Sequence, residues 1–113
     1  MTGPRLKTDF WIRAQIRACD INFLPAVISR RGDSDAGQVL IKCNRLNGRC
    51  EVFARTSTID GVPAWRRATG ATPVDEEEAH MVIEREVNFD PDIWILEIED
   101  RDEKYELDGP VIA

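Results

Sequence analysis

Apolar residues recur at three- and four-residue spacing in two segments of the chain, and this periodicity predicts two amphipathic helices. The first helix is expected to begin at Thr8-Asp9, where a hydroxyl or a carboxylate can cap free backbone N–H groups. The second is expected to begin in residues 72–75, with Thr72 as the cap, and to end before Pro91. The apolar stripes comprise Phe10, Trp11, Ala14, Ala18 and Ile21, widened by Ile12 and Ile16, in the first helix, and Ala79, Val82, Ile83 and Val87 in the second.

Outside the helices, alternating or continuous apolar runs predict strands. We expect strands at residues 24–29, 39–43 and 64–67, and one more after Gly48 that pairs with residues 39–43. Residues 93–98 are apolar at five of six positions, which is typical of a central strand that is covered on both faces.

The dipeptide Asn47-Gly48 predicts a tight hairpin, because a type I′ turn needs positive φ at both central residues. A two-residue loop places Cys43 opposite Val52 and Ile41 opposite Ala54, so these four residues would share one apolar face. The other face would then be basic and open to solvent. It would carry Lys42, Arg49 and Arg55 beside Leu40, Glu51 and Phe53.

Together the elements predict an α+β fold, with a small, mainly antiparallel sheet of four to five strands and two helices on one face. The length of 113 residues predicts a single domain spanning residues 1–113. The stretch from about residue 101 onward is polar and contains Asp108-Gly109-Pro110, so we expect a loose end there.

Composition excludes several classes of protein. With 42% hydrophobic and 32% charged residues, the chain can form one core and does not have the profile of a disordered tail. The longest apolar run, at residues 93–96, is far shorter than the ~20 residues of a membrane span, and the N-terminal segment lacks an apolar stretch of signal-peptide length. Cys19, Cys43 and Cys50 form no C-x-x-C pair, so we expect buried thiols in the reducing cytoplasm, without a disulfide or a zinc site.

Several strings of residues resemble a known family. They are RLKTDFW (residues 5–11), RRGD (30–33) with DAG (35–37), Lys42 with NRL (44–46), and FDPDIW (89–94) with EIEDR (97–101). In these strings the chain is similar to the alphaproteobacterial family DUF1491, a domain of unknown function. The resemblance covers most of the chain and implies a bacterial, single-domain cytosolic protein. It implies no activity, and no catalytic or binding residue can be carried over from it.

Candidate catalytic and metal-binding motifs are few. Asp33-Ser34-Asp35 followed by Gly37 is similar to the start of a calcium loop, but Gln38 and Asn44 stand where an EF-hand loop has Gly and Glu. We favour a turn whose aspartates accept backbone N–H groups. His80 is the only histidine, and we interpret it as an exposed residue of an acidic helix face. Neither a nucleophile signature nor a phosphate-binding loop is present, so we predict no catalytic residue, cofactor or metal site.

Charge is distributed unevenly along the chain. The formal net charge is −6, yet residues 1–70 contain 12 basic and 6 acidic side chains, whereas residues 71–113 contain 3 and 15. We expect a small binding or accessory module that contacts a protein partner, or a second copy of itself, through a basic surface. The residues proposed for this surface and its adjoining loop are Arg30, Arg31, Asp33, Asp35, Lys42, Arg45 and Arg49.

Three alternatives stay open. The acidic helix and tail can lie against the basic strands within one chain, which is the simplest explanation of the charge distribution. The chain can be a carboxylate- and metal-dependent enzyme that uses Asp33 and Asp35, or the acids between residues 90 and 100. It can also bind single-stranded nucleic acid through the basic hairpin face, although Phe53 is the only aromatic residue there to stack on a base.

Overall fold

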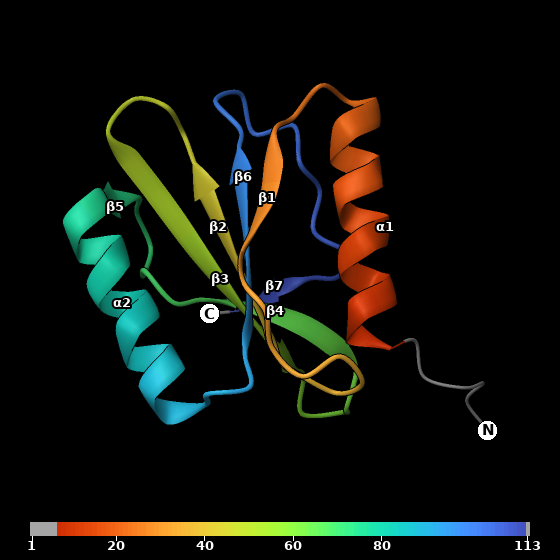
Figure 1. Cartoon of the computed structure of the whole chain (residues 1–113). Helices are drawn as coiled ribbons and strands as arrows, with labels where there is room; N and C mark the ends of the chain where they lie inside the picture. Colours follow the sequence, from red (N-terminus) through yellow and green to blue (C-terminus); the bar gives the residue numbers. More distant parts are fainter. Residues whose placement is uncertain (1–6, 113) are drawn as a thin grey trace.

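The computed structural model describes residues 7–112 and contains a seven-stranded mixed sheet between two helices (Figure 1). The helices are α1 (Thr8–Ile21) and α2 (Glu76–Phe89). The strands are β1 (Ala26–Arg30), β2 (Val39–Asn44), β3 (Arg49–Ser57), β4 (Pro63–Arg67), β5 (Val74–Asp75), β6 (Trp94–Glu99) and β7 (Val111–Ile112). Neither helix within residues 7–112 is long and apolar enough to cross a membrane.

The strand order is β1-β6-β2-β3-β4-β7, and the short β5 pairs with the start of β3. The α+β class is confirmed, but the expected four to five mainly antiparallel strands are wrong. After α2 the chain returns and inserts β6 between β1 and β2, parallel to β2, as a helical crossover allows. The other parallel pair joins β4 to β7, which comes from the segment expected to be a loose end.

The two helices cover opposite faces of the sheet, which corrects the prediction that both lie on one face (Figure 1). Helix α1 packs on the face that contains Ile41 and Cys43, whereas α2 packs on the face that contains Leu40. The reason is that β2 and β6 are apolar at successive positions, so each strand contributes to both faces. In α1 the buried stripe is rotated toward Ile12, and Phe10 is half exposed because it lies beside that stripe.

The β2–β3 hairpin exists, but its register differs by one residue from the prediction. Cys43 lies opposite Glu51, and Lys42 lies opposite Val52, because the loop contains three residues between Arg45 and Arg49. A slip of one residue moves every side chain to the other face of the sheet. The expected basic, solvent-facing surface therefore does not form, and Leu40, Glu51 and Phe53 are all buried.

Two further boundaries differ from the prediction. Helix α2 is capped by Asp75, whose Oδ1 accepts the N–H of Glu78 at 2.8 Å, and Thr72 lies before the short β5. The segment 100–110, called the C-terminal strap below, packs across the α1 face of the sheet and leads into β7. Its Tyr105 and Leu107 pack against the core, so the strap is anchored by its own side chains.

Candidate functional site

The residues proposed for a basic surface do not lie together. Arg30 is at the end of the sheet where β2 and β6 begin, and Arg31 follows it. Arg45 and Arg49 are at the opposite end, on either side of the β2–β3 turn. Lys42 lies between these ends, on the face covered by α2, so the predicted surface divides into three separate places.

Lys42 is held by acidic residues from the second half of the chain. Its Nζ donates to Glu76 Oε2 at 2.7 Å and lies 3.8 Å from Glu97 Oε1, and its side chain is only 12% exposed. Burial works to lower the pKa of Lys42, but the hydrogen bond to Glu76 and the two carboxylate charges raise it overall. The same hydrogen bond lowers the pKa of Glu76, so both groups are charged at neutral pH.

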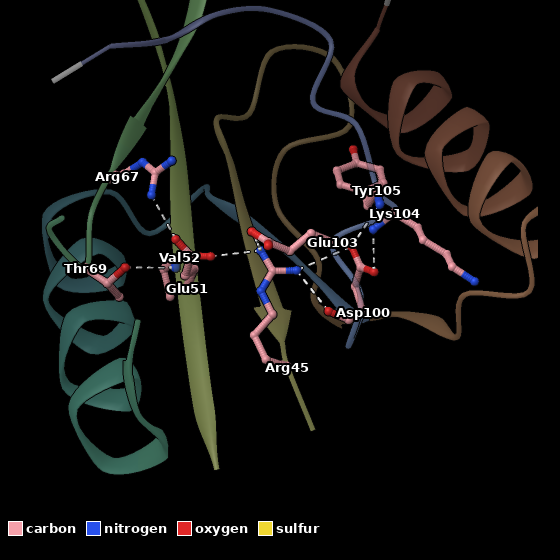
Figure 2. A network of polar contacts seen from close by, with 9 residues as sticks. All are labelled: Arg45, Glu51, Val52, Arg67, Thr69, Asp100, Glu103, Lys104 and Tyr105. Carbon is pink, nitrogen blue, oxygen red and sulfur yellow. Dashed lines mark hydrogen bonds and ion pairs between the residues drawn. The ribbon is translucent and has the colours of Figure 1, made fainter. Parts of the chain in front are cut away.

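Arg45 is the centre of a buried polar network beneath the C-terminal strap (Figure 2). Its Nη1 donates to the carbonyl oxygen of Asp100 at 2.9 Å, and its Nη2 donates to Glu51 Oε1 at 2.8 Å. The second oxygen of Glu51 accepts Nη1 of Arg67 at 3.0 Å. Burial works to lower the pKa of Arg45, but the hydrogen bond to Glu51 raises it overall. Because the N–H groups of Arg45 donate to acceptors within the chain, Arg45 stabilises the fold and does not form part of an exposed surface.

The start of the C-terminal strap is bound to the same network. The carboxylate of Asp100 lies 3.4 Å from Nη1 of Arg45 and accepts the backbone N–H groups of Lys104 and Tyr105, both at 2.8 Å (Figure 2). At the other end of the strap, Asp108 accepts the indole N–H of Trp11 at 2.7 Å and that of Trp65 at 3.0 Å. Sequence reasoning missed Asp108, because the carboxylate and Trp11 are 97 positions apart and no local motif connects them.

Arg30, Arg31 and the loop after them form a rigid corner. Arg30 Nη2 donates to the carbonyl oxygen of Pro91 at 2.9 Å, and the guanidinium of Arg31 lies 5.8 Å from the centre of a Trp94 ring. The loop has no space for a side chain at Gly32, where an added Cβ would lie 2.0 Å from the carbonyl oxygen of Asp92. This corner therefore presents its two arginines on a backbone that is packed against β6.

The loop aspartates have structural partners. Asp33 Oδ2 accepts the N–H groups of Asp35 at 3.2 Å and of Ala36 at 2.8 Å, which is the expected turn geometry. Asp35 lies 3.6 Å from Nζ of Lys7. Within residues 7–112 no group of three or more His, Cys, Asp or Glu side chains is placed to hold a metal ion.

The other candidate acids and the histidine are dispersed. Asp90 Oδ1 accepts the N–H of Asp92, and Glu97 and Asp100 pair with Lys42 and Arg45 as described above. His80 is exposed on α2, with Nε2 3.6 Å from Glu84 Oε1. Asp90, Glu97 and Asp100 are thus engaged in a turn or in ion pairs within the chain.

All three cysteines are buried and free, as the sequence analysis expected. Cys43 and Cys50 lie on opposite faces of the sheet and belong to different cores. Burial raises the pKa of Cys43 to about 12 and that of Cys50 to about 11. Since the thiolate is the reactive form, these cysteines are inert at neutral pH.

Within residues 7–112, four basic residues of the first half pair with acids of the second half. The pairs are Lys42–Glu76, Arg45–Asp100, Arg55–Asp108 and Arg66–Glu86. The uneven charge along the sequence is therefore offset, to this extent, by contacts within one chain.

A hollow of about 640 Å³ lies near the rigid corner, between the loop 35–38, the start of α1 and the end of β3. Trp11, Gln38, Arg55, Ser57 and Pro63 are among the residues that line it. Arg55 was expected only as one of several basic residues on an open strand face. The structure places its guanidinium 4.5 Å from the centre of a Trp11 ring, at the wall of this hollow.

Comparisons with known proteins agree with the fold. The chain is similar to a crystal structure of a DUF1491 family protein from Caulobacter crescentus CB15, with 36% identity, 96% of this chain and 100% of that chain covered, and a TM-score of 0.84. An NMR structure of a DUF1491 family protein from the same organism matches with 36% identity, 98% and 100% coverage and a TM-score of 0.82. A solution structure from A. tumefaciens shares the fold at 23% identity, with 92% and 90% coverage and a TM-score of 0.74.

No functionally curated protein matches the chain. The family model described as "Protein of unknown function (DUF1491)" matches residues 6–108, which include both helices and every strand except β7. The resemblance inferred from the sequence is thereby confirmed, and the chain belongs to the DUF1491 family.

Proposed function

We propose that the protein is a small cytoplasmic binding module that contacts an acidic surface of a protein partner through the corner containing Arg30 and Arg31. The observation that carries this proposal is the difference between basic residues. Lys42 and Arg45 are engaged by carboxylates, whereas within residues 7–112 neither Arg30 nor Arg31 has an ion-pair partner. Arginines that are not neutralised internally are available to an acidic partner.

The rigidity of the corner supports the same proposal. Gly32 and Gly37 fit closely against β6 and its preceding loop, and Trp94 Nε1 donates to the carbonyl oxygen of Asp33 at 2.7 Å. A surface that is already ordered loses less conformational entropy on binding than a mobile loop does. Three free cysteines also fit a reducing compartment, which is where we expect the partner.

The test compares two charge-reversed variants in quantitative affinity purification from the native bacterial cytoplasm. In the first variant Arg30 and Arg31 become Glu, and in the control the exposed Arg17 and Arg85 become Glu, so the change in net charge is the same. We expect a specific partner to be lost with the first variant and retained with the control. Equal recovery with both variants, or self-association as the only contact detected by sedimentation, would contradict the proposal.

A further inference from the structure

We propose that the hollow beside α1 binds a small oxyanion, meaning the carboxylate or phosphate group of a small polar molecule, and that Arg55 is the residue that holds it. This inference goes beyond the partner surface, because it concerns another face of the loop and a ligand of different chemistry. It rests on the two aromatic rings that contact Arg55, on the hydrogen bonds that the nearest carboxylate, Asp108, already accepts, and on the size and lining of the hollow.

The guanidinium of Arg55 is held in place by two aromatic rings. Its central carbon lies 4.5 Å from a ring centre of Trp11 and 5.5 Å from a ring centre of Trp65, and the two tryptophans contact each other. The side chain is 27% exposed, so most of it is buried while one side remains open. Stacking on aromatic rings uses the flat faces of a guanidinium and leaves the N–H groups at its edge available to a ligand.

Those N–H groups have no hydrogen-bond acceptor among residues 7–112. The nearest carboxylate oxygen, Asp108 Oδ2, is 3.7 Å from Nη2 of Arg55, which is too long for a hydrogen bond. Both oxygens of Asp108 already accept the indole N–H groups of Trp11 and Trp65. Arg55 can therefore form the paired hydrogen bonds that a guanidinium makes with a carboxylate or phosphate.

The hollow is of a suitable size and composition for such a ligand. Its volume of about 640 Å³ lies within the range of small-molecule sites. Ser57 and Gln38 provide a hydroxyl and an amide group, while Trp11 and Pro63 provide apolar surface. Asp35 also lines the hollow, and its negative charge is offset by Lys7 at 3.6 Å.

One wall of the hollow is held in place by contacts within the chain. Thr8 Oγ1 donates to the carbonyl oxygen of Gly37 at 2.9 Å, which joins the start of α1 to the loop. A Cβ at Gly37 would lie 2.7 Å from the carbonyl oxygens of Asp33 and Asp92, so the loop fits only with glycine there. The loop is therefore held in one conformation, and binding needs little ordering of the chain.

The test is an NMR titration of the whole ¹⁵N-labelled protein with inorganic phosphate, with citrate and with glycerol as a neutral control. The indole N–H signals of Trp11 and Trp65 report on Arg55, and the backbone N–H signals of α2, which covers the opposite face of the sheet, report on general effects of the added ion. We expect saturable shifts at Trp11 and Trp65 with an oxyanion only. Saturable shifts with phosphate alone would identify the ligand as a phosphate ester. Saturable shifts with citrate alone would identify it as a carboxylic acid.

Two variants make the result specific. Arg55→Gln should weaken binding by at least about tenfold, whereas Arg67→Gln, which changes a neighbouring arginine outside the hollow, should not. If Arg55→Gln fails to fold, Ser57→Glu puts a carboxylate into the hollow from an exposed position and should block binding. The absence of saturable shifts with both anions, or unchanged binding in Ser57→Glu and in a folded Arg55→Gln, would overturn the proposal.

Discussion

Arg45 and Arg49 flank the same turn, four residues apart, and have opposite environments. The side chain of Arg45 is 11% exposed and reaches Glu51 and Asp100, whereas the side chain of Arg49 is exposed. The difference arises because β6 ends beside β2, so that the N–H of Asp100 donates to the carbonyl oxygen of Asn44 at 2.8 Å. Arg45 and Asp100 are 55 positions apart, and hence no local sequence pattern distinguishes the two arginines.

Replacement of Arg45 by Met should therefore be strongly destabilising. The substitution leaves the carboxylates of Glu51 and Asp100 buried without their common cation, and the expected loss in the free energy of unfolding is about 3–5 kcal/mol. Urea denaturation at pH 7 measures this loss. Arg49→Met is the matched control and should change stability by less than about 0.5 kcal/mol. Equal stability of the two variants would show that the network in Figure 2 contributes little.

At the scale of elements, both helices and the strands β1, β2, β3, β4 and β6 were predictable, whereas the short β5 and β7, the register and the exact boundaries were not. The β2–β3 hairpin was expected from Asn47-Gly48, but β2 is apolar on both faces, and so its alternation could not determine which residues pair. The start of α2 is a similar case. Thr72 and Asp75 both have the chemistry of a cap, but Val74 and Asp75 pair with Cys50 and Arg49 of β3 as a short strand, so the helix begins only after Asp75.

This boundary gives a direct prediction for α2. Asp75→Ala should lower the free energy of unfolding by about 1 kcal/mol, because the N–H of Glu78 loses its acceptor. Thr72→Ala should have an effect smaller than about 0.5 kcal/mol, since Thr72 precedes β5 and does not cap the helix. Asp75→Asn keeps an acceptor oxygen and should recover much of the loss. Thermal unfolding measures the stability of the three variants. A larger loss of stability with Thr72→Ala than with Asp75→Ala would show that Thr72 caps the helix, as the sequence predicted.

For the molecule as a whole, topology explains why the predicted basic surface is absent. The insertion of β6 beside β2 brings Glu97 to Lys42 and Asp100 to Arg45, and α2 brings Glu76 to the same face. Neutralisation within one chain was one expectation from the uneven charge, but the pairs of Lys42 and Arg45 depend on this crossover. The hollow beside α1 was not predictable either, because Arg55, Trp11 and the loop 35–38 meet only in the folded chain.

The same charge pairing leads to a prediction about nucleic acid. We expect no measurable binding of a labelled oligothymidylate of about 20 nucleotides at about 150 mM salt, because a chain of phosphates needs several free cations along one surface. Lys42, Arg45 and Arg66 are paired internally, and Arg30 and Arg31 lie together at one end of the sheet. Fluorescence anisotropy measures the binding. Replacement of the partner acids Glu76 and Glu86 by Gln should increase binding at low salt, because Arg66 loses its ion-pair partner and Lys42 loses the carboxylate to which it donates.

The control for this prediction replaces Glu77 and Glu78 by Gln, two exposed acids whose removal changes the net charge by the same amount. If internal pairing is what prevents binding, the first variant should bind more tightly than the control, and its affinity should fall steeply as salt increases. Equal affinities of the two variants for the oligonucleotide would mean that the net charge of the protein, and not the pairing of particular residues, determines binding. Tight binding by the unmodified protein at about 150 mM salt would show that a phosphate chain displaces these pairs, and the nucleic-acid alternative would then replace the protein-partner proposal.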